Sequence, residues 1–161
     1  MNSFFIDSKE LFYDVPEDFS DFEYQITSIP RDYSLKGFVT LDSLIDGINS
    51  KMNNSGLVLI DNNVFNIFFK GKFTFDPSKI FFIKACEETK NLDTVLGICD
   101  SFITQNINKI SNVFVIGGGV LQDLGGTSSY LYKRGIPWQY IPTTLLGISD
   151  SCLGGKTAVN Y

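Results

Sequence analysis

The amino-acid sequence predicts an α/β fold, a Rossmann-like parallel sheet with helices on both faces. Two observations predict it. Four short segments have the apolar character of strands buried within a sheet: 57–60, 80–83, 113–116 and 138–141. The segments between them carry apolar residues at helical spacing, and strands that alternate with amphipathic helices are typical of parallel sheets. In such sheets ligands bind beyond the carboxyl ends of the strands.

The first half of the chain supplies a strand, a helix and the first buried strand. A strand is expected over 22–29. A helix is expected over 41–52, because its leucines and isoleucines recur every three or four residues. Thr40 stands at its N-cap position and Gly56 lies just beyond its end. The apolar strand 57–60 follows directly.

The second half alternates strands and helices. A loop is expected over 71–78, before the strand at 80–83. The apolar residues of 92–103 give the clearest amphipathic helix of the chain. The strand at 113–116 leads into three consecutive glycines, 117–119, which open the next helix.

Length, charge and cysteine content narrow the class of protein. The 161 residues suffice for one domain with a core, and we expect an acidic arm over 1–20 followed by the α/β domain over 21–161. The net charge of −5 argues against a nucleic-acid partner bound through its phosphates. No apolar run is as long as a membrane span. Three cysteines, at spacings that match no zinc or disulfide pattern, favour a cytoplasmic location.

The glycine run indicates a nucleotide site. Without Cβ atoms the backbone can approach a ligand closely, and the amide groups of a helix N-terminus suit a pyrophosphate. The run is not the G-x-G-x-x-G fingerprint, because Gln122 stands where the last glycine would fall. From the glycines alone, a tight strand-to-helix turn without a ligand is the alternative.

A second polar group lies in 142–160, which reads PTTLLGISDSCLGGKTAVN. Lys156 after a glycine suggests a phosphate-binding P-loop, but the first glycine of that motif would fall at Asp150. The carboxylate of Asp150 and the ammonium of Lys156 can instead bind polyol hydroxyls and stabilise charge as a hydroxyl is oxidised. From these two residues alone, a surface ion pair is the alternative.

Four linked motifs resemble the 3-dehydroquinate synthase family of sugar-phosphate cyclases. They are GGGVLQD at 117–123, YKRG at 132–135, IPTTLL at 141–146 and DSCLGGKTAVN at 150–160. Upstream, a strand that ends at Asp61 and the segment EETKNL at 87–92 also resemble family segments. The resemblance extends over most of 57–160.

The resemblance implies a carbon–oxygen lyase that uses NAD as a true catalyst. In the family, NAD transiently oxidises a secondary hydroxyl, phosphate is eliminated, the ketone is reduced again, and the enol closes a carbocycle by an intramolecular aldol step. For the dehydroquinate synthases the substrate is 3-deoxy-D-arabino-heptulosonate 7-phosphate, on the route to aromatic amino acids. Residues 21–161 would then form an NAD-binding domain.

The resemblance also assigns cofactor contacts. Asp61 would meet the adenosine ribose, Glu87 and Lys90 the sugar hydroxyls of the cofactor, and Asp123 would lie on the nicotinamide side. The pyrophosphate and the rest of the cofactor would be lined by residues of the glycine run and of the segment after the last strand: Gly118, Gly119, Val120, Thr143, Thr144, Leu146 and Ser151.

Three catalytic roles and a metal follow from the same resemblance. Asp150 and Lys156 would hold the substrate, and Arg134 would reach into a neighbouring subunit's site, which implies a homodimer; a solvated helix end is the alternative for Arg134. The family uses zinc or cobalt, ligated by one Glu and two His of a helical C-terminal domain. This chain has no histidine. We therefore expect an N-terminal fragment without metal ligands that is inactive alone and binds NAD weakly.

Departures from the family pattern keep other functions open. Gln122 replaces the glycine of GGGVIGDL, which suggests a divergent branch, whereas the run Gly154-Gly155-Lys156-Thr157 keeps the dehydroquinate-synthase form. The alternatives are another cyclase that uses sedoheptulose 7-phosphate, an NAD- and metal-dependent polyol dehydrogenase, and a non-catalytic nucleotide-binding module. The dehydrogenase is disfavoured because such enzymes carry a Thr-x-x-Gly-Thr-Gly-like stretch after the last strand.

Overall fold

The structure is a computed structural model that describes residues 2–6, 9–13, 20–28, 32–52, 55–154 and 157–160. The chain divides into two compact units, Met1–Leu44 and Ile45–Tyr161. The boundary that the sequence predicts between residues 20 and 21 stays a prediction.

Two antiparallel hairpins make up most of the first unit. Strand β1 (Asn2–Ile6) pairs with β2 (Lys9–Tyr13), and β3 (Phe22–Ile26) pairs with β4 (Tyr33–Gly37). β3 is the strand expected over 22–29, and it ends at Ile26. From the sequence we expect an acidic arm over the residues that form β1 and β2. This expectation rests on the many acidic residues there and does not take account of the strand-forming residues in the two short runs.

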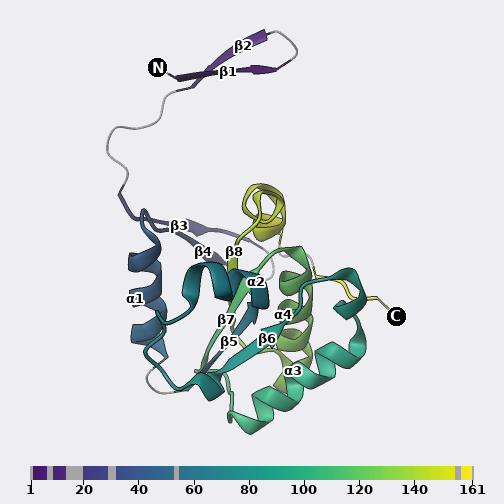
Figure 1. Ribbon diagram of the computed structural model, residues 1–161. Coiled ribbons are helices and arrows are strands. Elements are labelled where there is room, and N and C mark those ends of the chain that lie inside the picture. The colour runs from purple at the N-terminus through teal and green to yellow at the C-terminus, as the bar shows by residue number, and fades with distance from the viewer. Residues whose placement is uncertain are drawn as a thin grey trace. The chain divides into compact units, whose positions relative to one another are not determined.

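A four-stranded parallel sheet forms the centre of the second unit (Figure 1). Its strand order is β6-β5-β7-β8, with bounds β5 (Gly56–Asp61), β6 (Ile80–Ile83), β7 (Asn112–Gly117) and β8 (Gln139–Pro142). Leu59 pairs with Phe81 on one side and Val115 on the other. All four predicted strands are confirmed, and so is the α/β fold. The carboxyl ends of the strands share one edge because the strands are parallel.

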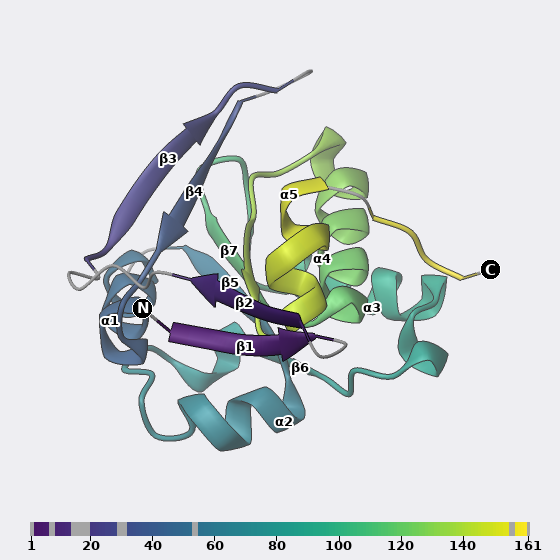
Figure 2. The same cartoon turned by 90° about the horizontal axis from the view of Figure 1, so that it is seen from above.

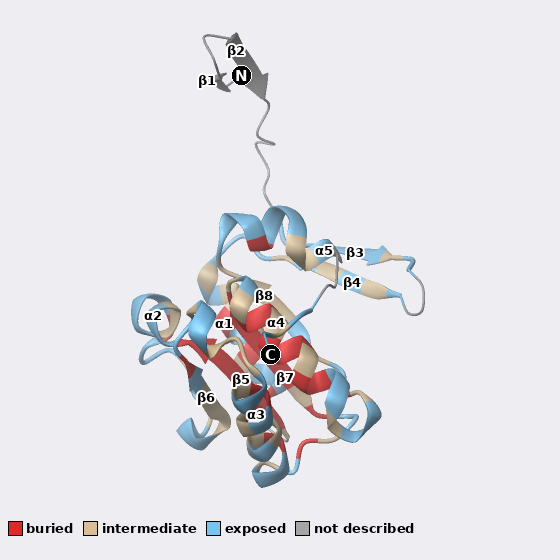
Figure 3. Cartoon of the chain, turned by 90° about the vertical axis from the view of Figure 1, so that its right-hand side faces the viewer, coloured by how far each residue is buried: buried red, intermediate tan, exposed pale blue. Residues whose placement is uncertain are grey.

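Helices cover both faces of this sheet. α3 (Leu92–Thr104) and α4 (Gly119–Leu131) lie side by side on one face (Figure 2). Leu59 and Val115 of the sheet belong to the same buried cluster as apolar residues of these two helices. α1 (Leu41–Lys51) lies on the opposite side in Figure 1, and its Ile45 and Ile48 are buried. Figure 3 shows the burial concentrated on β5, β7 and the sheet-facing side of α4. The core therefore packs the central strands of the sheet against α3 and α4.

The predicted helix boundaries have clear local causes. Thr40 caps α1 as expected, since its Oγ1 accepts a hydrogen bond from the Ser43 amide at 3.1 Å. Asn91 caps α3 in the same way, through the Thr94 amide at 2.9 Å. Gly118 stands at the N-cap of α4, so the glycines do open this helix.

In the described ranges, the other helical elements are short. They are α2 (Asn62–Val64), π-helical turns at Phe65–Phe69 and Gly147–Ser151, 3₁₀ turns at Pro77–Lys79, Glu87–Thr89 and Tyr132–Arg134, and α5 (Cys152–Gly154). None of the helices in these ranges combines the length and apolar character that crossing a bilayer requires.

Candidate functional site

The glycine turn after β7 is built to leave backbone amides accessible. Gly118 takes an extended conformation (φ −88°, ψ −166°) and offers no side-chain cap to α4. The first amide groups of any helix lack a partner within the helix. A Cβ placed on Gly119 would meet no atom within 4 Å, so open space lies in front of this turn. The partial positive charge of the helix N-terminus makes that space suitable for an anion.

Residues of β8 and of the segment after it brace the glycine turn from the other side. The Thr143 amide and the Tyr140 hydroxyl both donate to the Gly117 carbonyl, at 3.0 and 3.1 Å. A Cβ on Gly118 would lie only 2.9 Å from Cγ2 of Thr144, so the backbone passes close to this threonine. Thr144 Oγ1 accepts from the Gly147 amide at 3.1 Å and so ties the next turn to the same place. The two threonines predicted for the cofactor site thus flank the glycines.

Burial raises the pKa of Tyr140 to about 12. The nearby Ser151 opposes this shift of the Tyr140 pKa, and the negative charge of Asp123 adds to it. The phenol therefore keeps its proton at neutral pH and remains a donor to the Gly117 carbonyl.

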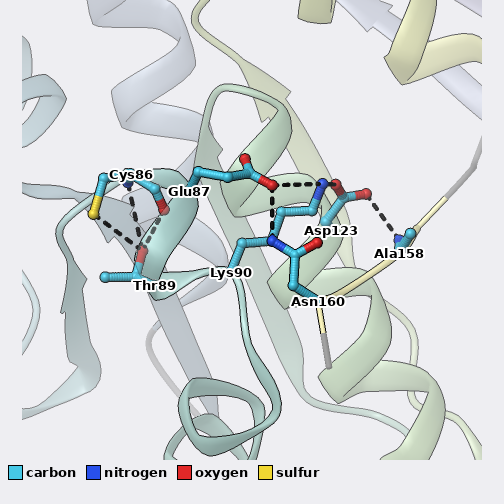
Figure 4. A network of polar contacts seen from close by, with 7 residues as sticks. All are labelled: Cys86, Glu87, Thr89, Lys90, Asp123, Ala158 and Asn160. Carbon is cyan, nitrogen blue, oxygen red and sulfur yellow. Dashed lines mark hydrogen bonds and ion pairs between the residues drawn. The ribbon is translucent and has the colours of Figure 1, made fainter.

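An ion-pair network joins the segment after β6 to α4, the helix that the glycine turn opens (Figure 4). Lys90 Nζ is 2.6 Å from Asp123 Oδ2 on α4 and 3.9 Å from Glu87 Oε1. The side chains of Lys90 and Asp123 are about four-fifths buried, at 19% and 18% exposure, whereas Glu87 is 65% exposed. The hydrogen bond to Asp123 raises the pKa of Lys90, and the charges of Asp123 and Glu87 add to this effect against desolvation. Lys90 is therefore a fixed ammonium at the carboxyl edge of the sheet.

The segment that carries Glu87 and Lys90 is held by its own hydrogen bonds. Thr89 Oγ1 donates to the Lys84 carbonyl at 2.7 Å and accepts from the Cys86 amide at 3.4 Å. The side chains of Cys86 and Thr89 thus close the 3₁₀ turn Glu87–Thr89 from both ends. This local structure follows β6 directly and places both predicted cofactor residues near α4.

Residues 157–160 add contacts that the sequence does not predict. The Ala158 amide donates to Asp123 Oδ1 at 3.1 Å, and Asn160 Nδ2 donates to Glu87 Oε1 at 2.8 Å. The Asn160 amide also donates to the Lys90 carbonyl at 2.9 Å. In the sequence, these residues stand out only as the end of the motif DSCLGGKTAVN, and the motif does not indicate which residues they contact.

Asp61 is 5% exposed and is already engaged by backbone amides. Its Oδ1 accepts from the Asn63 and Val64 amides at 2.8 and 2.9 Å, and its Oδ2 accepts from the Ala85 amide at 3.1 Å. The carboxylate therefore caps α2 and joins the ends of β5 and β6. Its predicted contact with an adenosine ribose stays a prediction.

Of the two predicted substrate residues, the structure describes only Asp150. It is exposed and lies in the π-helical turn Gly147–Ser151, whereas Lys156 falls outside the described residues. The Ser151 carbonyl accepts from Gln122 Nε2 at 2.7 Å, and Gln122 is 2% exposed. The residue that replaces the family's glycine thus ties the turn of Asp150 to α4. Leu146, predicted to contact the cofactor, is 69% exposed, and Val120 packs against the core.

Arg134 lies at the far end of α4 from the glycine turn. The helix of 13 residues separates the two places by about 20 Å, so Arg134 does not join the site of its own chain. Lys133, Arg134 and Gly135 all have positive φ, at 47°, 61° and 92°, and Arg134 is exposed. Within the described residues, no three His, Cys, Asp or Glu side chains gather as a metal site would require.

Residues 80–161 match a family model described as 3-dehydroquinate synthase N-terminal. A 3-dehydroquinate synthase of Streptococcus pyogenes serotype M49 (strain NZ131) is 36% identical over 124 residues, which are 75% of this chain and 35% of that protein. The chain thus spans about a third of the length of that relative.

Two solved structures share the fold. A 2-deoxy-scyllo-inosose synthase, complexed with carbaglucose-6-phosphate, NAD+ and Co2+, has a TM-score of 0.68 and 25% identity over 87% of this chain and 40% of that chain. A 2-epi-5-epi-valiolone synthase from Streptomyces hygroscopicus subsp. jinggangensis 5008, with NAD+ and Zn2+ bound, has a TM-score of 0.60 and 30% identity over 73% of this chain and 35% of that chain.

Proposed function

The chain belongs to the 3-dehydroquinate synthase family, and we propose that it forms the NAD-binding part of a sugar-phosphate cyclase. One observation carries this proposal. The turn Gly118–Gly119 at the N-terminus of α4 faces open space, and the fixed ammonium of Lys90 lies in the adjoining network. A pyrophosphate on backbone amides, next to polar groups that can bind sugar hydroxyls, is the chemistry of a dinucleotide site.

The proposed cofactor contacts follow the edge of the sheet. The pyrophosphate lies against the amides of Gly118, Gly119 and Val120, and the sugar hydroxyls meet Glu87 and Lys90. Further contacts come from residues near these groups: Asp61, Asp123, Thr143, Thr144, Leu146 and Ser151. NAD, when bound, supplies reversible hydride transfer from a secondary hydroxyl.

The proposed substrate is 3-deoxy-D-arabino-heptulosonate 7-phosphate, held by Asp150 and Lys156. Support comes from the sequence of these motifs and from the curated relative, which is a 3-dehydroquinate synthase. We propose a cytoplasmic homodimer in which Arg134, exposed at the far end of α4, reaches into the site of the neighbouring chain, as the family resemblance implies. No step is assigned to a metal, since the described residues offer no ligand set.

The proposed cofactor site is tested by Gly119→Val. A side chain at this position enters the open space in front of the turn without meeting other residues, so the fold should persist while the pyrophosphate is excluded. We expect isothermal titration calorimetry to show NAD binding to the wild-type chain and at least a tenfold loss in the variant, with equal melting temperatures. Equal NAD affinity in both chains would contradict the site.

Activity and substrate are tested separately. We expect the chain alone to release no phosphate from the heptulosonate phosphate, and detectable release would refute its inactivity. Titration of the NAD-loaded chain with the heptulosonate phosphate and with sedoheptulose 7-phosphate ranks the two substrates. We expect tighter binding of the former, and the opposite order would favour the other cyclase.

A further inference from the structure

We propose that residues 157–160, here called the strap, position the cofactor-binding side chains, and that Asn160 is the positioning residue for Glu87. The inference rests on the proposed function, because it concerns the same dinucleotide site. It assigns a role to residues that no sequence motif links to a ligand.

The strap is fixed to the segment that carries Glu87 and Lys90. The Asn160 amide donates to the Lys90 carbonyl at 2.9 Å, and Asn160 forms a parallel bridge with Asn91. Figure 4 shows the strap running between Asp123 and the backbone at Lys90. Backbone bonds of this kind hold the strap in place independently of its side chains.

The strap donates one hydrogen bond to each of two carboxylates from different elements. The Ala158 amide takes Oδ1 of Asp123 and leaves Oδ2 to Lys90 at 2.6 Å. Asn160 Nδ2 takes Oε1 of Glu87, the same oxygen that lies 3.9 Å from Lys90. Both donors are neutral, so the strap orients the carboxylates without cancelling their charge.

The hydrogen bond from Asn160 matters most for Glu87, because it orders a side chain that is otherwise exposed. Its side chain is 65% exposed, and an exposed glutamate samples many rotamers that must be frozen when a ligand binds it. Because both described contacts of its carboxylate use Oε1, the Asn160 bond fixes the side chain while Oε2 can still accept from a sugar hydroxyl. A preordered carboxylate raises ligand affinity by lowering this entropic cost.

The start of the strap is seated where α4 lacks a side chain. A Cβ on Gly126 would lie 2.3 Å from Cγ2 of Thr157, so Thr157 occupies the space beside this glycine. The helix that begins at the cofactor glycines thus also carries the seat of the strap. The strap therefore links the segment after β6 to α4, which follows β7, and these two segments carry the two halves of the proposed cofactor site.

The test compares Asn160→Ala with Asn112→Ala. Asn112 makes a matched bond, from its Nδ2 to the Lys51 carbonyl at 2.9 Å, but it stands at the opposite end of β7. We expect calorimetry to show NAD affinity reduced about three- to tenfold by Asn160→Ala and unchanged by Asn112→Ala. Inorganic pyrophosphate, titrated by NMR, should bind both variants as it binds the wild type, because it contacts only the glycine turn.

This design separates positioning from folding. Equal NAD affinity in Asn160→Ala and the wild type overturns the role of the strap while leaving the cofactor site intact. The role of the strap is also overturned if Asn160→Ala weakens pyrophosphate binding as much as it weakens NAD binding. A wild-type chain that binds no NAD overturns the proposed function and the inference with it. Should Asn160→Ala fail to fold, Ala158→Pro removes the donor to Asp123 and is expected to weaken NAD binding in the same range.

Discussion

Tyr140 shows how a single side chain secures the proposed cofactor turn. Its hydroxyl reaches across from β8 to the carbonyl of Gly117, the last residue of β7. The same burial that raises its pKa keeps the hydroxyl available as a donor. One phenol therefore helps to set the backbone from which the glycine turn departs.

The pKa of Tyr140 makes stability depend on alkaline pH. A folded pKa of about 12, above the unfolded value of 10.0, means that its stabilising contribution is complete below pH 10.0 and is lost as pH rises through about 12. We predict that the free energy of unfolding falls more steeply over this range in the wild type than in Tyr140→Phe. Urea unfolding at several pH values measures both slopes, and identical slopes would contradict the assignment.

Gln122 is a second example, and it marks a limit of prediction. From the sequence it is only a departure from a glycine motif, whereas in the structure its buried amide holds the turn of Asp150 through the Ser151 carbonyl. A residue's own type does not specify a partner that lies 29 positions away. Contacts of this kind depend on the packing of α4, which the sequence pattern does not resolve.

α4 connects the glycine turn, the ion-pair network and the seat of the strap. It can do so because it lies close to the sheet: a Cβ on Gly125 would be 2.6 Å from Cγ2 of Val115. Asp123 faces Lys90 from the same helix, and Gly126 faces Thr157. A shift of α4 would therefore disturb all three features together.

Two glycine-to-alanine substitutions test this packing. Gly126→Ala forces Thr157 aside, so we predict a loss of about 1–3 kcal/mol in the free energy of unfolding and weaker NAD binding. Gly97→Ala in α3 meets no atom within 4 Å and should instead add about 0.4–1 kcal/mol. Urea titrations measure both changes. Stabilisation by both substitutions would show that the strap is not seated on Gly126.

Elements with a strong hydrophobic pattern could be predicted from the sequence, whereas the hydrogen bonds that connect one element to another could not. Continuous apolar runs identified the central strands β5 and β7, which are buried along nearly their whole length, whereas the edge strands β6 and β8 are only partly buried. The amide partners of Asp61 and the bonds of Asn160 escaped prediction, since they join segments brought together only by the fold. The sequence therefore located the glycine turn and Lys90, but not how Lys90 is held.

The second unit exposes apolar side chains on the turn that follows β8. Leu145 is 82% exposed and Leu146 69%, and they are joined by Ile148 and Leu153 at 57% and 47%. These residues follow one another within a short helical stretch, so they form one exposed apolar group. Such groups favour association between molecules.

We predict that the 18.0 kDa chain self-associates through this group. Leu145→Glu should lower the mass measured by light scattering, because a charge at the most exposed position opposes burial of the group. Ile110→Glu is the control, since Ile110 is 89% exposed but lies in the connection from α3 to β7. A monodisperse wild-type monomer, or an equal effect of both substitutions, would contradict the prediction.

The strand order also dictates when the protein can assemble during synthesis. β5 pairs with β7 from Gly56 opposite Asn112 onward, so the central pair of the sheet cannot close until residues beyond 112 have left the ribosome. β8 and the strap emerge later still. The nascent chain therefore exposes β5 until β7 has emerged, and the proposed cofactor site is completed only once the strap has followed β8 out of the ribosome.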